Sequence, residues 1–259
     1  MPYPSMRPFV FINMAMTADG KIATANRRVS SFGSSRDQAH LLRLSATADA
    51  VMCGARTLES GPISLGPGSA SYRRLRLRHG LAEYNLRIIV SGSGSLNPNA
   101  EVFRHRFSPI IVLTTDRLSA RKRRGLEALA NEVKICGETA IDFPFALRWL
   151  RDQWQVQRLL CEGGGELNGA LFAADLVDEL HLTICPYIFG GRLAPTIAGG
   201  LGLPSLAHAI PMAQISMQRI GQELFLVYRR FKTPTQSCAG GPHCRAQDTP
   251  TRPISSITT

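Results

Sequence analysis

The stretch that decides the fold of this chain runs Leu159-Leu160-Cys161-Glu162-Gly163-Gly164-Gly165-Glu166-Leu167-Asn168-Gly169-Ala170-Leu171. Its opening apolar run is typical of a buried strand, and its three consecutive glycines predict a tight turn. The spacing that follows predicts a helix with one apolar face, formed by Leu167, Ala170, Leu171 and Ala174. An alternating run from residue 180 to 184 then favours another strand. Strand, turn, helix and strand within about 30 residues predict a βαβ unit, which builds parallel sheets.

The glycine turn has a chemical meaning as well as a structural one. Glycines let the backbone approach a ligand closely, and the start of the following helix offers free N–H groups and a positive dipole end that suit a phosphate. A tight turn without a ligand is the alternative interpretation. The glycines lack the spaced fingerprint and later acidic residue of a Rossmann dinucleotide site, so a standard Rossmann domain is not predicted.

Apolar runs and turn signals elsewhere predict the other elements. Strands are expected at 9–16, 49–53, 86–90, 109–114 and 132–136. Helices are expected from residue 34 or 35 to 47 and at 142–154, and a basic helix is expected after residue 121. A long loop is expected at 61–71, and strands 212–217 and 223–230 are expected to form a closing antiparallel hairpin. Strands and helices alternate, so the expected class is α/β with a mostly parallel central sheet. Residues 1–231 are expected to form one domain. Residues 232–259, rich in Pro, Ser, Thr and Gly, are expected to form a disordered tail.

Composition and charge exclude several classes of protein. The 259 residues are 44% apolar and 19% charged, as in ordinary globular proteins. No apolar run approaches the roughly 18 residues that span a bilayer, and no secretory signal opens the chain, so a cytoplasmic protein is expected. The six cysteines are scattered without metal-ligand spacing, which predicts reduced thiols and no metal site.

The formal net charge of +11 raises the possibility of nucleic-acid binding. The densest clusters are Arg73–Arg78 and Arg121–Arg124, and neither is interleaved with the aromatic residues that a single-strand platform requires. A basic surface that attracts a phosphorylated substrate and a phosphorylated cofactor is the simpler explanation. No nucleic-acid partner is expected.

Two further motifs, in register with the glycine turn, point to a known family. The first is Asn13-Met14-Ala15-Met16-Thr17-Ala18-Asp19-Gly20-Lys21-Ile22-Ala23, and the second combines Arg36-Asp37…His40-Leu41 with Ala48-Asp49-Ala50-Val51-Met52-Cys53-Gly54-Ala55-Arg56-Thr57. Over roughly residues 8–231 the chain resembles the reductase domain of riboflavin-biosynthesis proteins, in the dihydrofolate-reductase-like superfamily. The zinc-deaminase signature of bifunctional relatives is absent, so the resemblance implies the reductase half alone.

This resemblance implies a three-layer dihydrofolate-reductase-like fold, a homodimer, and an activity. NADPH would reduce a ribosylaminopyrimidine 5′-phosphate to its ribitylamino form. The implied catalytic residues are Glu162 and Lys21, and the implied substrate-binding residues are Asp19, Arg36 and Glu162. The implied cofactor-binding residues are Ala15, Thr57, Ser91, Ser93, Gly163, Gly164, Gly165, Leu167, Asn168 and Gly169. Thr114 and Thr115 are further candidates for the nucleotide, and Arg56 or Arg117 for its 2′-phosphate.

Each assignment has a structural alternative. Glu162 could simply accept backbone N–H groups in the turn, Lys21 could be an exposed loop lysine, and Asp19 more readily shapes the turn before Gly20. Loop polarity alone could explain the serines and threonines.

The chain also departs from the family pattern. Glu59-Ser60-Gly61-Pro62 stands where an Asp-Asp-Pro is usual, and Ser45 stands where an arginine near the substrate phosphate is common. Arg36, Arg43 or a member of Arg73–Arg78 could supply that contact. Otherwise the substrate would be another carbonyl or imine.

Two other functions remain as alternatives. Dihydrofolate reduction is disfavoured because that enzyme's early Leu-Pro-Trp turn is missing, and both tryptophans, Trp149 and Trp154, lie in one late helix. A non-catalytic nucleotide-binding protein would share the glycine turn without the chemistry.

Overall fold

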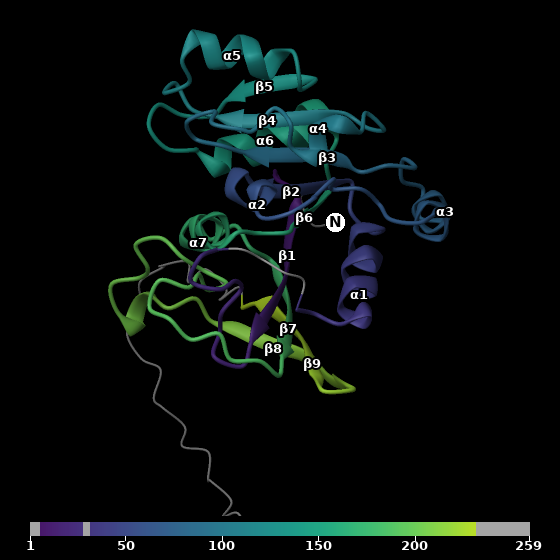
Figure 1. Ribbon diagram of the computed structural model, residues 1–259, viewed down its shortest axis with the longest axis vertical. Helices are drawn as coiled ribbons and strands as arrows, with labels where there is room; N and C mark the ends of the chain where they lie inside the picture. Colours follow the sequence, from purple (N-terminus) through teal and green to yellow (C-terminus); the bar gives the residue numbers. More distant parts are fainter. Residues whose placement is uncertain (1–5, 28–31, 232–259) are drawn as a thin grey trace, which may run out of the picture.

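The computed structural model describes residues 6–27 and 32–231, and its centre is one mixed sheet of nine strands in the order β5-β4-β3-β2-β6-β1-β7-β9-β8 (Figure 1). The strands are β1 (Phe9–Thr17), β2 (Ala50–Gly54), β3 (Leu86–Val90), β4 (Ile110–Thr114), β5 (Glu132–Ile135), β6 (Arg158–Cys161), β7 (Glu179–Cys185), β8 (Met212–Ile220) and β9 (Glu223–Arg230). Strands β1 to β7 are all parallel, whereas β9 is antiparallel to both β7 and β8. The expected mostly parallel sheet with a C-terminal hairpin is therefore confirmed.

Helices cover both faces of this sheet. They are α1 (Ser35–Ser45), α2 (Ala55–Glu59), α3 (Ala70–Arg78), α4 (Glu101–Arg104), α5 (Ala120–Glu127), α6 (Phe143–Trp154) and α7 (Gly165–Ala173), with a short 3₁₀ helix at Leu206–His208. One apolar core joins α6 and α7 to one sheet face through residues such as Leu147, Leu171 and Ile12. A second core joins α1, α2, α4 and α5 to the other face through residues such as Leu126 and Phe11. The result is the expected three-layer arrangement.

The chain order explains where a ligand can enter. The connections after β1 to β4 place their helices on the face of α1, whereas α6 and α7 cover the opposite face. Strand β6 lies between β2 and β1 in the sheet. The helix that follows β2 packs on one face of the sheet, whereas the helix that follows its neighbour β6 packs on the other. Such a switch point opens a crevice at the carboxyl ends of the strands, where open α/β sheets bind their ligands.

The predicted βαβ unit is present, with β1 lying between its two strands. Strands β6 and β7 both pair in parallel with β1, and α7 connects them. The predicted apolar face of this helix is only half right. Leu167 and Leu171 are buried, but Ala170 and Ala174 are exposed. The buried face instead includes Asn168, because its side chain binds a neighbouring loop.

Three short helices, α2, α3 and α4, were not predicted from the sequence. The loop expected at 61–71 ends at residue 69, since α3 carries the first arginine cluster and buries Arg76 within it. Helices α2 and α4 were also not expected, and both have five residues or fewer. Such short helices bury one or two apolar residues each, too few to produce a periodic signal.

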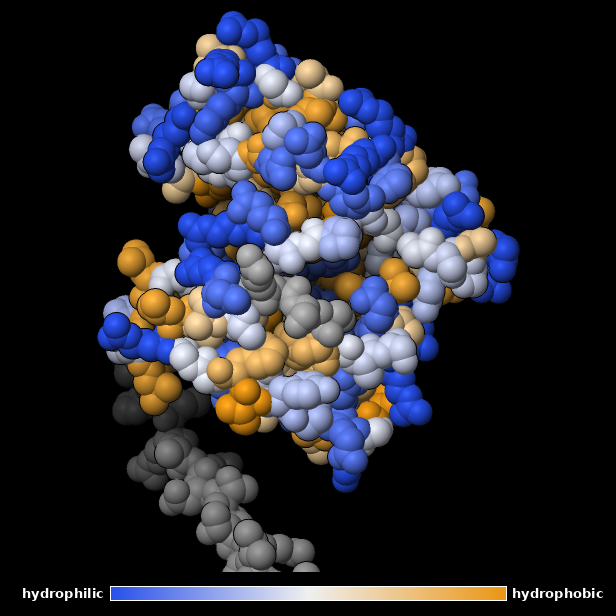
Figure 2. Space-filling model, viewed as in Figure 1, coloured by the Kyte–Doolittle hydropathy of each residue, from blue (hydrophilic) through white to orange (hydrophobic). Residues whose placement is uncertain are grey.

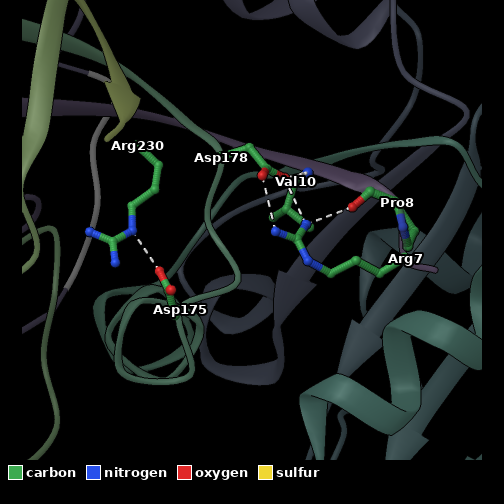
Figure 3. A network of polar contacts seen from close by, with 6 residues as sticks. All are labelled: Arg7, Pro8, Val10, Asp175, Asp178 and Arg230. Carbon is green, nitrogen blue, oxygen red and sulfur yellow. Dashed lines mark hydrogen bonds and ion pairs between the residues drawn. The ribbon is translucent and has the colours of Figure 1, made fainter. Parts of the chain in front are cut away.

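An ion pair fixes the amino ends of the central strands (Figure 3). Arg7 donates from both terminal nitrogens to Asp178, at 2.7 and 3.0 Å, and Asp178 also accepts from the Val10 amide at 2.9 Å. In the same region Arg230, the last residue of β9, donates to Asp175 at 2.6 Å. Through these bonds Asp178 joins β1 to the start of β7. The Asp178 side chain is only 9% exposed, so the ion pair is largely shielded from solvent.

Two findings apply only to the described part of the chain. Within it, no helix is both long and apolar enough to cross a membrane. The same residues include no group of three or more His, Cys, Asp or Glu side chains arranged to hold a metal ion. The predicted disordered tail at 232–259 lies outside the described residues.

Candidate active site

The candidate site begins where β2 and β6 end side by side. Glu162 follows β6 directly, and its backbone N–H donates to Met52 in β2 at 2.8 Å. One residue later the loops meet again, since the Gly54 amide donates to the Gly163 carbonyl at 2.9 Å. Beyond this bond the two segments of the chain separate, one entering α2 and the other α7, on opposite faces of the sheet. The glycine turn and the residues near Thr57 are thus brought together as expected.

The turn favours glycine at position 163 and leaves little room for a side chain at position 164. Gly163 has φ +82°, and a Cβ there would lie 2.6 Å from the sulfur of Met14. Gly164 donates its N–H to the Thr57 hydroxyl at 3.1 Å, and a Cβ on Gly164 would lie 3.1 Å from the same oxygen. No side chain caps the start of α7. The start of α7 therefore has no side-chain cap, and an uncapped helix N-terminus is an arrangement that fits a phosphate.

The next two glycines serve packing. A Cβ on Gly165 would lie 2.3 Å from the Thr196 carbonyl oxygen, and one on Gly169 would lie 2.0 Å from the Gly199 carbonyl oxygen. Asn168 is fully buried and donates to the Ile197 carbonyl at 2.8 Å. Helix α7 therefore lies directly against residues 196–199. The Gly165-x-x-x-Gly169 spacing was the sequence signal for this close approach.

Glu162 is the ionisable group best placed for chemistry. Its carboxylate forms no hydrogen bond or ion pair with any other described residue, although its side chain is half-buried. Burial raises the pKa of this carboxyl from 4.5 to about 7. The alternative role of accepting backbone N–H groups in the turn is not observed. A carboxyl that can hold or release a proton near neutral pH thus stands beside the glycine turn.

Lys21 is connected to the same region through a neighbouring loop. It pairs with Thr196 in an isolated antiparallel bridge, and its Nζ donates to the Ala194 carbonyl at 3.5 Å. Because Thr196 also packs against Gly165, residues 194–199 link Lys21 to the start of α7. Lys21 is half-buried, so it is not a freely exposed loop lysine.

Asp19 is held by protein groups rather than directed at a ligand. Its carboxylate accepts from the Thr17 hydroxyl at 2.5 Å, the Phe189 amide at 3.2 Å and the Gly190 amide at 2.7 Å. These bonds, led by that from Thr17, hold the pKa of Asp19 below its usual value. The geometry favours the structural alternative, in which Asp19 shapes the turn and fixes the loop after β7.

A polar loop after β3 extends the site along the sheet edge. Ser91 is buried and donates to the Ser95 carbonyl at 3.3 Å, while the Ser93 hydroxyl donates to that of Ser95 at 3.2 Å. Lys122 of α5 reaches this loop, donating to the Ser93 carbonyl at 3.3 Å and the Ser95 hydroxyl at 2.6 Å. Sequence reasoning missed Lys122 because a basic run on a helix ordinarily marks a solvated face.

Two threonines at the end of β4 lie beside this loop and differ in their bonding. The Thr115 hydroxyl donates to the Gly92 carbonyl at 2.6 Å. The Thr114 hydroxyl is buried and has no partner within the described part of the chain.

Other predicted residues are placed differently. Arg56 pairs with Glu166 across the start of α7, and both side chains are exposed. Arg36 is exposed near the β8–β9 turn, 3.8 Å from where a Cβ on Gly221 would stand. Within the described part of the chain Arg36 makes no hydrogen bond or ion pair with the glycine turn, although both lie at the carboxyl edge of the sheet.

Ser45, which stands where the family commonly has an arginine, lies away from the glycine turn. It is the last residue of α1, is only 1% exposed, and donates to Asn85 at 3.2 Å. Helix α1 begins at the carboxyl edge, where Ser34 bonds Glu223, and Ser45 therefore lies at the opposite, amino edge. A side chain at position 45 therefore lies at the edge of the sheet opposite the glycine turn.

The remaining predicted residues lie in the walls of the site. Ala15 is half-buried in β1, one residue beyond Met14, which adjoins Gly163. Leu167 is 7% exposed and packs into the core beneath α7. Both positions support the backbone rather than offering a polar side chain.

Comparison with known proteins identifies the family of this chain. Residues 8–226 match the sequence profile of the family described as the RibD C-terminal domain. The chain belongs to this family. It is 31% identical over 196 residues to the 2,5-diamino-6-ribosylamino-4(3H)-pyrimidinone 5′-phosphate reductase of Archaeoglobus fulgidus, which covers 75% of this chain and 88% of that protein. It is 30% identical over 223 residues to the reductase of the same name from Methanothermobacter thermautotrophicus, covering 86% and 98%.

A solved structure agrees with the fold of this RibD C-terminal domain protein. The pyrimidine reductase-like protein of Corynebacterium diphtheriae superposes with a TM-score of 0.71 at 20% sequence identity, covering 87% of this chain and 93% of that one. The dihydrofolate-reductase-like fold is therefore confirmed, and the chain is an enzyme of the reductase type that acts in riboflavin biosynthesis.

Proposed function

We propose that this enzyme uses NADPH to reduce a ribosylaminopyrimidine 5′-phosphate to its ribitylamino form. The observation that carries the proposal is the uncapped start of α7 at the switch point, with the unpaired Glu162 carboxyl beside it. The glycine turn fits the pyrophosphate of a dinucleotide, since Gly164 has no side chain to keep a phosphate from the start of α7, and a Cβ there would lie 3.1 Å from the Thr57 hydroxyl. The names of the two archaeal relatives support the substrate class.

The chemistry needs few protein groups. The cofactor supplies a hydride to C1′ of the ring-opened sugar, and the attached nitrogen gains a proton. Glu162, whose pKa burial raises to about 7, holds or releases a proton near that nitrogen at neutral pH. Lys21, fixed by the bridge to Thr196, provides an N–H donor toward the sugar oxygen. Positioning and charge stabilisation then account for the rate enhancement.

The preference for NADPH over NADH rests on the loop after β3. Lys122 stands over Ser93 and Ser95, and the exposed Arg117 follows β4 on the neighbouring strand. A 2′-phosphate placed on this loop would meet two cations and several hydroxyl groups. Since Arg56 is paired with Glu166, Lys122 and Arg117 are the residues we assign to this role.

One departure from the family pattern bears on the substrate, because Glu59-Ser60-Gly61-Pro62 replaces the usual Asp-Asp-Pro. Reduction of another imine or carbonyl at the same site is the second candidate. The position of Ser45 at the amino edge removes one of the two reasons for preferring that candidate.

A homodimer in the cytoplasm completes the proposal. Large exposed apolar side chains gather over the loop between β7 and β8 and on β8 itself, at the lower left of Figure 2. They include Ile188, Leu193, Leu201, Leu206 and Met217, each at least 63% exposed. Because β8 is also an edge strand of the sheet, this surface suits a second copy of the chain.

Cofactor binding tests the proposal at the glycine turn. Gly164→Val would place side-chain atoms where a Cβ already lies 3.1 Å from the Thr57 hydroxyl, and the affinity for NADPH should fall at least tenfold, about 1.4 kcal/mol. Gly61→Val, at a position with open space around it, serves as the control. Equal NADPH affinity of wild type and folded Gly164→Val in calorimetry would show that the turn does not hold the cofactor.

A further inference from the structure

A pocket of about 300 Å³ lies at the amino ends of β3, β4 and β5, on the edge of the sheet opposite the candidate active site. It is formed by the start of these strands and the segments leading into them. Its lining residues are Arg87, Arg106, Phe107, Ser108, Pro109, Ile110, Leu129 and Asn131. No aspartate or glutamate is among these lining residues, whereas two are arginines.

Arg87 is the buried cation of this pocket. It is fully buried in β3, and its guanidinium lies 4.1 Å from the centre of the Phe107 ring. It donates to the Val102 carbonyl at 2.8 Å, the Ser108 hydroxyl at 3.1 Å and the Ser108 carbonyl at 2.6 Å. A guanidinium has five N–H groups, so two remain after these three bonds.

The other fully buried arginine provides an internal comparison. Arg76 also donates to backbone carbonyls, those of Ser45, Ala48 and Ala82, and ties α3 to the sheet. The Asp49 carboxylate lies near Arg76 and favours its charge. The charge that acts on Arg87 is instead that of Arg106, which repels it. The hydrogen bonds that join α3 to the sheet account for the burial of Arg76, whose charge is also balanced by Asp49. Arg87 makes similar hydrogen bonds, but no carboxylate balances its charge among the described residues.

The remaining polar groups of the pocket are donors. Asn131 uses its Oδ1 to accept from the Ile110 amide at 2.9 Å, so its Nδ2 is left to donate. Among the described residues Arg106 donates one hydrogen bond, to the Ala128 carbonyl at 3.3 Å, which leaves four of its N–H groups. The Ser108 hydroxyl accepts from Arg87 and retains its own proton to donate. Phe107, Ile110 and Leu129 supply apolar walls.

We propose that this pocket binds a small organic phosphate, with the phosphate between Arg106, Arg87 and Asn131 and an apolar or aromatic body against Phe107 and Leu129. Two guanidinium groups match the charge of a phosphate monoester better than that of a carboxylate. A buried cation without a counter-ion is costly, and an anionic ligand would remove that cost. The site is separate from the reductase chemistry and does not depend on it.

The test uses phenyl phosphate as the probe and the isotope-labelled full chain without added nucleotide. Backbone amide shifts of Ser108, Leu129 and Asn131 should change saturably with phenyl phosphate, and less strongly with benzoate. Arg106→Gln should weaken the binding at these amides at least tenfold. Arg104→Gln is the matched control, since Arg104 is an equally exposed arginine two residues away that pairs with Glu101 outside the pocket. It should leave the affinity unchanged.

Three results would overturn the proposal. One is the absence of saturable shifts at these amides in the wild type. Another is an equal loss of affinity in Arg104→Gln and Arg106→Gln, which would indicate a general charge effect. The third is binding of benzoate as tight as that of phenyl phosphate, which would refute the phosphate assignment. Turnover of the reductase reaction is measured in parallel, so that failure of this pocket is distinguished from failure of the proposed activity.

Discussion

At the scale of single residues, the account depends most on Glu162. Its carboxyl lies at the end of β6, has no protein partner among the described residues, and has a pKa raised by burial to about 7. Burial alone perturbs it, which is typical of a group kept for a reaction rather than for an ion pair. The strand end and the adjacent glycines made Glu162 predictable from the sequence. The absence of a partner for its carboxylate could not be predicted from the sequence. It depends on whether residues of the neighbouring strands β2 and β1 reach that carboxylate in the folded protein.

Replacing Glu162 with glutamine should therefore separate chemistry from folding. Turnover of Glu162→Gln should fall roughly 10²-fold with little change in NADPH affinity, the typical effect of removing an acid–base group. The titration near pH 7 should also disappear from its kcat profile. Glu166→Gln, four residues along and 64% exposed, is the matched control and should retain the wild-type profile. A wild-type rate in Glu162→Gln would refute the assignment.

The raised pKa also predicts the pH dependence of stability. The unfolded carboxyl releases its proton near pH 4.5 and the folded one near pH 7, so between these values the folded state holds more protons. Its contribution to the free energy of unfolding is full below pH 4.5 and is lost as the pH rises through 7. Wild type should therefore lose melting temperature relative to Glu162→Gln from pH 5 to 8. A constant difference in Tm would contradict the raised pKa.

At the scale of elements, the sequence predicted the strands well and the helix faces less well. Strand β3 was placed at its observed bounds, and β1, β2 and β4 within a residue, because buried parallel strands are short apolar runs. The buried face of α7 was mistaken because it is set by contact with residues 196–199, which are distant in sequence. The apolar character of Ala170 and Ala174 carried no information about that contact. The arginine-rich α3 was missed for the same reason, as its buried residue is Arg76.

The packing of α7 gives a test at this scale. Gly169→Ala should destabilise the protein by about 1–3 kcal/mol, because the new Cβ would lie 2.0 Å from a backbone oxygen of Gly199. Gly125→Ala in α5, where nothing lies within 4 Å of the added Cβ, should instead stabilise by about 0.5–1 kcal/mol. The free energies of unfolding of both variants and the wild type, measured by denaturant unfolding, test this prediction. Equal stabilisation by both changes would mean that α7 does not pack closely on residues 196–199.

At the scale of the whole molecule, the family resemblance predicted the three-layer fold, and the strand order and the helices on both faces of the sheet confirm it. It could not predict which surface is left uncovered, since that depends on how the loop between β7 and β8 folds over the sheet edge. The tail at 232–259 remains a prediction of disorder from composition alone.

The exposed apolar surface predicts the oligomeric state. Met217→Lys on β8, at a side chain 63% exposed, should convert a homodimer to a monomer or weaken it at least tenfold, because a charge would be buried at the interface. Leu77→Lys on α3, 55% exposed and away from β8, is the control. Sedimentation of the two variants and the wild type over a range of concentrations provides the measurement. A monomeric wild type at all concentrations would refute the dimer.

The most direct measurement follows NADPH consumption by the wild-type chain with two substrates, the 2,5-diamino-6-ribosylamino-4(3H)-pyrimidinone 5′-phosphate and its deaminated uracil counterpart. The account predicts stoichiometric oxidation of NADPH with at least one of them, formation of the ribitylamino product, and a much slower reaction with NADH. Lys21→Met should lower this rate while leaving NADPH affinity intact. If the wild type leaves both pyrimidine phosphates unreduced but oxidises NADPH with another carbonyl or imine, the proposed reaction is contradicted.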